Sequence, residues 1–222
     1  MHSELFGQHL ETSSDDRVAL QNPQLVRIAL DGELLARQGA MVAYQGAIDF
    51  AYEGAGSVGR FLKRALTGEG LPLMKCSGRG ALFLARDARE LFVVHLEGDS
   101  LTVNADNLLA FDASLSWDIK RVEGVGMLAG GLFNTVLTGR GSVVLSAVGT
   151  PVVLDAAEAP TFTDLQSAIA WSSSLRTSIR RTATAGALIG RGSGEAFQLA
   201  FAGEGWVVVQ ASEGPVVATH SH

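Results

Sequence analysis

Cysteine is almost absent from the sequence: Cys76 is the only one, so no disulfide can form within the chain. Proteins without disulfides are typical of a reducing compartment. The first residues carry several acids and no apolar core, so they fit neither a secretory signal nor the arginine-rich leader of a mitochondrial precursor. No apolar run approaches the roughly 18 residues that a membrane-spanning helix needs. These absences predict a soluble, cytoplasmic protein.

Charge is also scarce. Charged residues make up 18% of the chain, whereas about 25% is usual in globular proteins. So little charge indicates a surface that is small or shared with another subunit, and we therefore expect a homo-oligomer. The formal net charge is −6, which argues against nucleic acid as a partner because such proteins gain most of their affinity from basic residues.

Metal-binding residues are few and scattered. Of the five histidines, His95 lies alone within an expected strand, and the others stand near the two ends, at positions 2, 9, 220 and 222. A metal site needs ligands whose positions converge. The acidic residues form only close pairs in expected turns, and no pair is marked for opposite acid and base roles. The sequence therefore predicts no metal, no cofactor and no catalytic residue.

Cys76 is the one candidate nucleophile. Its neighbour Lys75 could lower the pKa of the thiol, and His95 could act as its base. Two later copies of the same sequence pattern, however, place Leu137 and Phe201 at the equivalent position. Apolar residues there favour a packing role for Cys76, so an enzyme that acts through this thiol is the less favoured interpretation.

Glycine, by contrast, is abundant, with 26 residues. The stretch 68–85 reappears as 130–147 and again as 194–211, each time with a short apolar strand on either side of a Gly-x-Gly step. Glycine supplies the positive φ of a tight turn or bulge, so we expect a hairpin turn or a bulge at each step. The three steps are Gly78/Gly80, Gly139/Gly141 and Gly203/Gly205.

The repeat extends beyond the glycine steps. Short apolar runs separated by frequent turn signals fill most of the chain, and a long internal period indicates a repeat architecture. We predict an all-β fold in which three pseudo-repeated β units pack as a pseudo-threefold β-sandwich or prism. The expected divisions are an N-terminal arm (1–22), a single all-β domain (23–212) made of three units (about 24–85, 90–147 and 150–211), and a C-terminal tail (213–222).

One connector is expected to be helical. Residues 58–66 place apolar side chains at helical spacing. Arg60, Lys63 and Arg64 fall on one side of this short helix and form a candidate interaction patch for an anionic membrane surface or an acidic partner. A solvated helix face is the commoner explanation for such a group.

Three segments carry a family resemblance: residues 61–85 (FLKRALTGEGLPLMKCSGRGALFLA), 108–124 (LLAFDASLSWDIKRVEG) and 201–213 (FAGEGWVVVQASE). They resemble the Altered Inheritance of Mitochondria (mitochondrial-biogenesis) family of bacterial, archaeal and fungal-mitochondrial proteins. The resemblance implies three similar β units around a pseudo-threefold axis, in a fold similar to the trp RNA-binding attenuation protein. It implies neither RNA binding nor any catalytic residue.

These observations favour a non-enzymatic scaffold or interaction protein with an unknown protein partner, in peripheral contact with a membrane through Arg60, Lys63 and Arg64. A module that binds a small ligand or a nucleic acid is the alternative, with nucleic acid disfavoured by the acidic balance. An enzyme built on Cys76 or on the carboxylates is the least favoured reading.

Overall fold

The computed structural model describes residues 2–52, 72–121, 133–181 and 197–212, and almost all of its regular structure is β-strand. The expected all-β fold is therefore confirmed. In chain order the elements are α1 (Leu5–Gln8), β1 (Val18–Asn22), β2 (Leu25–Arg37), β3 (Met41–Tyr52), β4 (Leu73–Leu84), β5 (Glu90–Asn104), β6 (Leu108–Asp112), β7 (Ser116–Arg121), β8 (Phe133–Ala147), β9 (Val152–Asp155), β10 (Thr161–Asp164), β11 (Ala168–Ser172), β12 (Arg176–Arg181), β13 (Phe197–Ala202) and β14 (Trp206–Val209).

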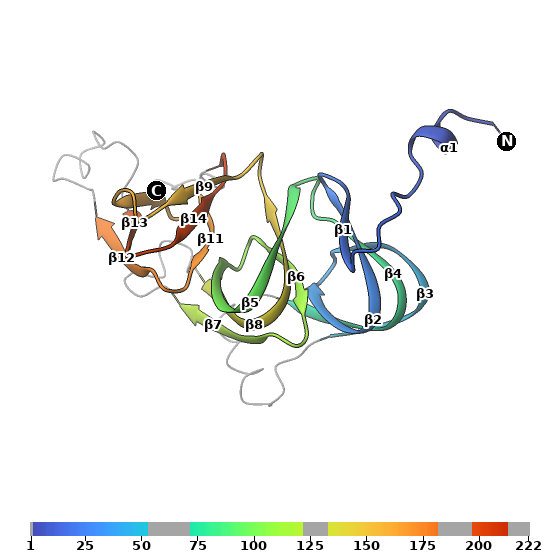
Figure 1. Ribbon diagram of the computed structural model, residues 1–222, viewed down its shortest axis with the longest axis horizontal. Helices are drawn as coiled ribbons and strands as arrows, with labels where there is room; N and C mark the ends of the chain where they lie inside the picture. Colours follow the sequence, from blue (N-terminus) through green and yellow to red (C-terminus); the bar gives the residue numbers. More distant parts are fainter. Residues whose placement is uncertain (1, 53–71, 122–132, 182–196, 213–222) are drawn as a thin grey trace, which may run out of the picture.

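The described strands form two antiparallel sheets. The larger sheet has eleven strands in the order β3-β4-β2-β6-β8-β5-β11-β14-β9, with β1 added to β2 and β7 added to β8. The smaller sheet has the order β10-β13-β12. Figure 1 shows β1–β4 at one end of the molecule, β5–β8 in the middle and β11–β14 at the other end. The chain thus progresses along the long axis of the molecule.

Alternating burial explains why these segments are strands. In β2, Val26, Ile28 and Leu30 are buried while the residues between them are more exposed, which is the period-two pattern of a strand with one face on the core. All five residues of β6 are buried, because this strand lies inside the larger sheet between β2 and β8. The buried apolar side chains gather in three clusters, which include Phe111, Leu82 and Trp171 respectively.

The glycine steps do not form hairpin turns. Gly78 and Gly80 lie inside β4, which is paired with β2 and β3 on both sides of the step. The second step lies inside β8, where the pairing with β5 shifts register opposite Gly139. The third step, Gly203/Gly205, joins β13 to β14, which belong to different sheets. The hairpin expectation is therefore wrong: the glycines lie within a strand or connect two strands of different sheets. The alternative expectation of a bulge agrees with the register shift opposite Gly139. Positive φ is common to both arrangements, so the sequence pattern alone cannot separate them.

Close backbone approach explains why glycine is required in β4. A Cβ on Gly78 would lie 2.1 Å from the carbonyl oxygen of Ala47, and one on Gly80 would lie 2.0 Å from that of Gln45. Both carbonyls belong to β3, where Gly46 pairs directly with Gly80. A side chain on Gly78 or Gly80 would therefore collide with the main chain of β3.

The expected N-terminal arm contains a strand of the domain. β1 pairs with β2, and the amide of Ala29 donates to the carbonyl of Arg17 at 2.7 Å. Arg17 also forms an ion pair with Asp112 of β6. The ordered sheet thus begins about five residues before the boundary expected at residue 23. The expected helix at 58–66 and the tail at 213–222 lie outside the described residues.

Candidate functional site

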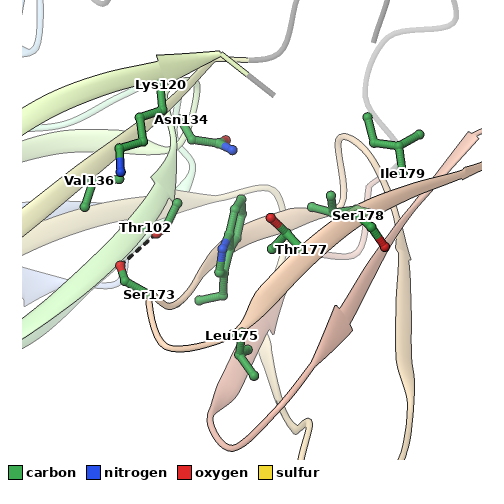
Figure 2. A pocket seen from close by; sticks show the side chains of 11 residues that line it. Thr102, Lys120, Asn134, Val136, Ser173, Leu175, Thr177, Ser178 and Ile179 are labelled. Atoms are coloured by element: carbon green, nitrogen blue, oxygen red, sulfur yellow. Dashed lines mark hydrogen bonds between the residues drawn. The ribbon is translucent and has the colours of Figure 1, made fainter. Parts of the chain in front are cut away.

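A cleft of about 370 Å³ opens where strands of the larger sheet face strands of the smaller one (Figure 2). β5, β7 and β8 supply one wall, and β12 and β13 supply the other, with the turn between β11 and β12 at the base. The lining residues are Thr102, Lys120, Asn134, Val136, Trp171, Ser173, Leu175, Thr177, Ser178, Ile179 and Leu199.

Strand register brings Lys120 and Asn134 together. They are direct partners in the antiparallel pairing of β7 with β8, so both side chains leave the same face of the sheet as neighbours. Figure 2 shows them side by side on one wall, with Thr177 and Ser178 on the opposite wall. The local sequence of β7 dictates this orientation, because polar Asp118 and Lys120 alternate with the more buried Trp117.

Neither Lys120 nor Asn134 is satisfied by the rest of the described chain. Asn134 is only 9% exposed, yet its carboxamide makes no hydrogen bond with a described residue, and Lys120 makes no ion pair with one. The carboxamide is not among the fully buried polar groups that lack a partner, so it reaches the space of the cleft. These two side chains are therefore available to a ligand.

A hydroxyl pair ties the two walls together at the base of the cleft. The Oγ1 atom of Thr102 on β5 lies 2.8 Å from the Oγ atom of Ser173, in the turn that joins β11 to β12 (Figure 2). Thr102 is also the strand partner of Trp171 across β5 and β11. These contacts fix the turn before β12 against β5, and so they connect the two walls of the cleft.

The floor of the cleft is apolar. Trp171 is 3% exposed and packs edge-to-face against Phe201, with ring centroids 5.3 Å apart. Leu175 and Leu199 belong to the same buried cluster. The described lining contains a lysine, an amide and hydroxyls but no carboxylate. The arrangement suits a small ligand that has an anionic or strongly accepting group attached to a compact apolar body.

Cys76 lies elsewhere, inside β4. Its side chain is fully buried in an apolar cluster, and this burial raises the pKa of the thiol to about 11. The packing role expected from the equivalent Leu137 and Phe201 is therefore confirmed. His95 on β5 is exposed, with its Nδ1 atom 3.1 Å from the Oγ atom of Ser142, as expected for an outward-facing strand residue.

Neither Cys76 nor His95 is among the residues that line the cleft. Arg60, Lys63 and Arg64 lie outside the described residues, so the interaction patch stays a prediction. Among residues that are described, no group of three His, Cys, Asp or Glu side chains could hold a metal ion. No helix within the same ranges is long and apolar enough to cross a membrane.

Sequence reasoning missed Lys120 and Asn134. They are 14 positions apart, and only the register between β7 and β8 makes them neighbours. The local sequence shows only that Ser116, Asp118 and Lys120 alternate with apolar residues. This pattern predicts that Lys120 lies on the polar face of its strand, but it does not predict which residue pairs with it.

The fold and the cleft define a class of protein: an all-β chain with two antiparallel sheets and a polar-walled cleft between them. The chain belongs to the mitochondrial biogenesis AIM24 family, whose sequence profile matches residues 17–212. This match confirms the family resemblance seen in the sequence. No match is found among curated proteins.

A solved structure has a similar fold. An X-ray crystal structure of a protein from Streptococcus pyogenes is similar with a TM-score of 0.70 and 23% sequence identity, over 88% of this chain and 92% of that one. At this identity the similarity bears on the fold alone. The expected likeness to the trp RNA-binding attenuation protein stays a prediction.

Proposed function

We propose that the protein is a non-enzymatic binding module that takes a small anionic ligand in the cleft between its two sheets. The neighbouring side chains of Lys120 and Asn134, which make no hydrogen bond or ion pair with a described residue, carry this proposal. An ammonium and a carboxamide side by side supply the donors that a carboxylate requires. This choice corresponds to the small-ligand alternative left open by the sequence.

The floor of the cleft narrows the ligand class. Trp171, Leu175 and Leu199 favour an apolar body, and about 370 Å³ admits only a compact one. Ligand pockets usually combine such a floor with a few polar groups that fix orientation. We therefore propose a short-chain carboxylate, with its head group at Lys120 and Asn134 and its chain over the floor.

The test compares hexanoate with hexanol, which differ in the charged head group. Binding is measured by isothermal titration calorimetry to the full chain and to the variants Lys120→Met and Asn134→Leu. A charged hydrogen bond is worth about 1.5–3 kcal/mol, so we expect each variant to weaken hexanoate binding about tenfold or more. Hexanol should bind weakly and equally to all three proteins.

The matched control is Arg79→Gln, which removes an exposed basic side chain that does not line the cleft and that pairs with Asp31 across β4 and β2. It should leave hexanoate binding unchanged. The proposal is wrong if hexanoate does not bind, or if Lys120→Met and Asn134→Leu bind it as tightly as the natural sequence does.

A second candidate function is that of a self-associating scaffold, and the edge strand β3 favours it. β3 is 12 residues long and lies at the end of the larger sheet. Val42, Tyr44 and Tyr52 are 56%, 47% and 58% exposed, and Asp49 is the only charged residue of the strand. Long apolar edges with little charge and no proline pair readily with another strand. We propose that two copies pair through β3.

We also propose that the three units are related by a pseudo-threefold repeat. Two corresponding hydrogen bonds support this relation. The amide of Ser142 donates to Asp112 at 2.8 Å, and the amide of Trp206 donates to Ser172 at 3.1 Å. In each case the acceptor ends an apolar strand and the donor follows a Gly-x-Gly step. A crystal structure in which the three units do not superpose would contradict the proposal.

The membrane contact and the cytoplasmic location stay proposals from the sequence. They are tested together by fractionating cells and by sedimenting the protein with anionic vesicles. Reversing the charges of Arg60, Lys63 and Arg64 should abolish vesicle binding. If the variant sediments with the vesicles as much as the natural sequence does, the patch does not bind the membrane.

A further inference from the structure

Three arginines converge on a single carboxylate away from the cleft. The Nη2 atom of Arg86 and the Nη1 atom of Arg89 lie 2.6 Å and 3.0 Å from the two oxygens of Asp106. The Nη2 atom of Arg37 lies 3.2 Å from the first of these oxygens and 3.4 Å from the Asp106 carbonyl. The cluster joins the end of β2, the β4–β5 turn and the β5–β6 turn.

The positive charge of this cluster is not balanced. Asp106 offsets one guanidinium, and among the described residues the only other acid that forms an ion pair with the three arginines is Asp87, which is 81% exposed and lies 3.8 Å from the Nε atom of Arg86. The arginine side chains are only 13–21% exposed, so water screens them incompletely. Burial, together with the charge of Arg86 beside it, lowers the pKa of Arg37. The three side chains retain an excess of positive charge.

Hydrogen-bonding capacity is also left over. Each guanidinium carries five N–H donors, but each of the three uses a single terminal nitrogen on Asp106. The Nη1 atom of Arg86 is buried and has no hydrogen-bond partner among the described residues. Arg86 and Arg89 are held in this arrangement by a tight turn in which Asp87 and Ala88 both adopt positive φ. One carboxylate therefore leaves several N–H donors of the three arginines unused.

We propose that Arg37, Arg86 and Arg89 form a binding site for a phosphate group, shared with Asp106. Several guanidinium groups on one face are the arrangement that recognises tetrahedral oxyanions, because each offers paired N–H donors. The phosphate comes either as the free ion or a small phosphate monoester, or as the head group of a lipid. This site is separate from the cleft, and its residues line no part of it.

The first test titrates inorganic phosphate into the full chain at constant ionic strength, with chloride as the balancing anion, and follows binding by calorimetry. We expect the variant Arg89→Gln to weaken phosphate binding about tenfold or more, since it removes a charged hydrogen bond. Arg79→Gln is the matched control and should bind phosphate normally. Lys120→Met should also bind phosphate normally, which separates this site from the cleft.

A second variant distinguishes an anion site from a structural ion network. In Asp106→Asn the competing carboxylate charge is gone, so phosphate should bind more tightly and raise the melting temperature more than it does in the natural sequence. A purely structural cluster predicts that Asp106→Asn is destabilised and that phosphate restores nothing. If Asp106→Asn does not fold, Arg37→Gln takes the place of this variant, and undiminished phosphate binding would overturn the proposal.

Vesicle sedimentation identifies the source of the phosphate. Binding to phosphatidic acid vesicles but not to inorganic phosphate, lost in Arg89→Gln, would support the lipid head group. Binding of inorganic phosphate without vesicle binding would support the free ion or monoester. Absence of both, or equal binding by Arg89→Gln in both assays, would overturn the site.

Discussion

At the scale of single residues, burial decides the chemistry of Cys76. A thiolate is the reactive form of cysteine, and the apolar surroundings of Cys76 raise its pKa to about 11. At neutral pH the side chain is therefore a neutral thiol inside β4, packed with Leu82 and Ile48 in one cluster. The residue that looked like a nucleophile in the sequence acts as a small apolar side chain.

This pKa predicts a loss of stability in alkali. An unfolded cysteine has a pKa of about 8.5, so at higher pH the unfolded chain releases the thiol proton while the folded protein keeps it. The stabilising contribution is fully present below the unfolded pKa and is lost as the pH rises towards the folded value of about 11. We expect the free energy of unfolding to fall by up to about 1.4 kcal/mol per pH unit in this window.

Urea unfolding measured at several pH values checks this expectation. The variant Cys76→Ala should be less stable at pH 7, because it leaves a small cavity. Its stability should nevertheless fall less steeply above pH 8.5, about the pKa of an unfolded thiol. Parallel curves for the two proteins would show that Cys76 does not titrate in this range.

Single residues also show what the sequence could reveal. The packing role of Cys76 was predictable because the repeat supplies apolar equivalents, Leu137 and Phe201. Lys120 and Asn134 were not predictable as a pair, since their proximity depends on long-range register rather than on spacing along the chain. Arg37 and Asp106 were missed for the same reason, because they are 69 positions apart.

At the scale of elements, the close approach of β3 and β4 depends on glycine. Gly78 and Gly32 are direct partners across β4 and β2, and both have positive φ, at 131° and 120°. They differ in the space around them: a Cβ on Gly78 would meet the Ala47 carbonyl at 2.1 Å, whereas one on Gly32 would meet nothing within 4 Å. Comparing substitutions at Gly32 and Gly78 therefore separates the cost of backbone strain from the cost of a steric clash.

Alanine substitutions use this difference. Gly32→Ala should cost about 1–3 kcal/mol, the usual strain of a non-glycine residue at such a φ. Gly78→Ala adds a clash with main-chain atoms, so its cost should exceed about 4 kcal/mol or prevent folding. Chemical denaturation of the two variants measures both. Equal losses would show that β3 moves away from β4 without difficulty.

The elements also mark the limit of local patterns. The strands around Gly78 and Gly80 were predicted, and the sequence shows that glycine is needed there. The sequence did not predict whether the chain turns back at Gly78 and Gly80 or continues as one strand. That outcome depends on β2 and β3, which supply partners along β4.

At the scale of the whole molecule, the position of β3 at the edge of the described sheet bears on assembly. The low charge content of the chain predicted a homo-oligomer, and β3 offers an apolar edge of suitable length. The other end of the larger sheet is β9, a strand of only four residues with exposed Val152 and Val153. The longer edge offers more backbone hydrogen bonds, so we expect β3 to be the strand that pairs.

Lysine substitutions test the edge. Val42→Lys combined with Tyr44→Lys should convert an oligomer to monomers, because charged edge residues oppose pairing. Light scattering coupled to size exclusion measures the mass, and circular dichroism checks the fold. The matched control, Val153→Lys on β9, should leave the mass unchanged. A monomeric natural protein, or dissociation by Val153→Lys alone, would contradict the β3 interface.

The order of the larger sheet also has a consequence for synthesis. Strands β1–β8 pair only with one another in the described chain, except that β5 pairs with β11, which begins at Ala168. Ribosomes deliver the chain from its N-terminus, so β5 leaves the exit tunnel long before its second partner does. On a polysome, neighbouring nascent chains hold the same uncovered strand close together. While residues 148–172 are being made, β5 has β8 as a partner but not yet β11, so one of its edges stays open to pairing with another copy.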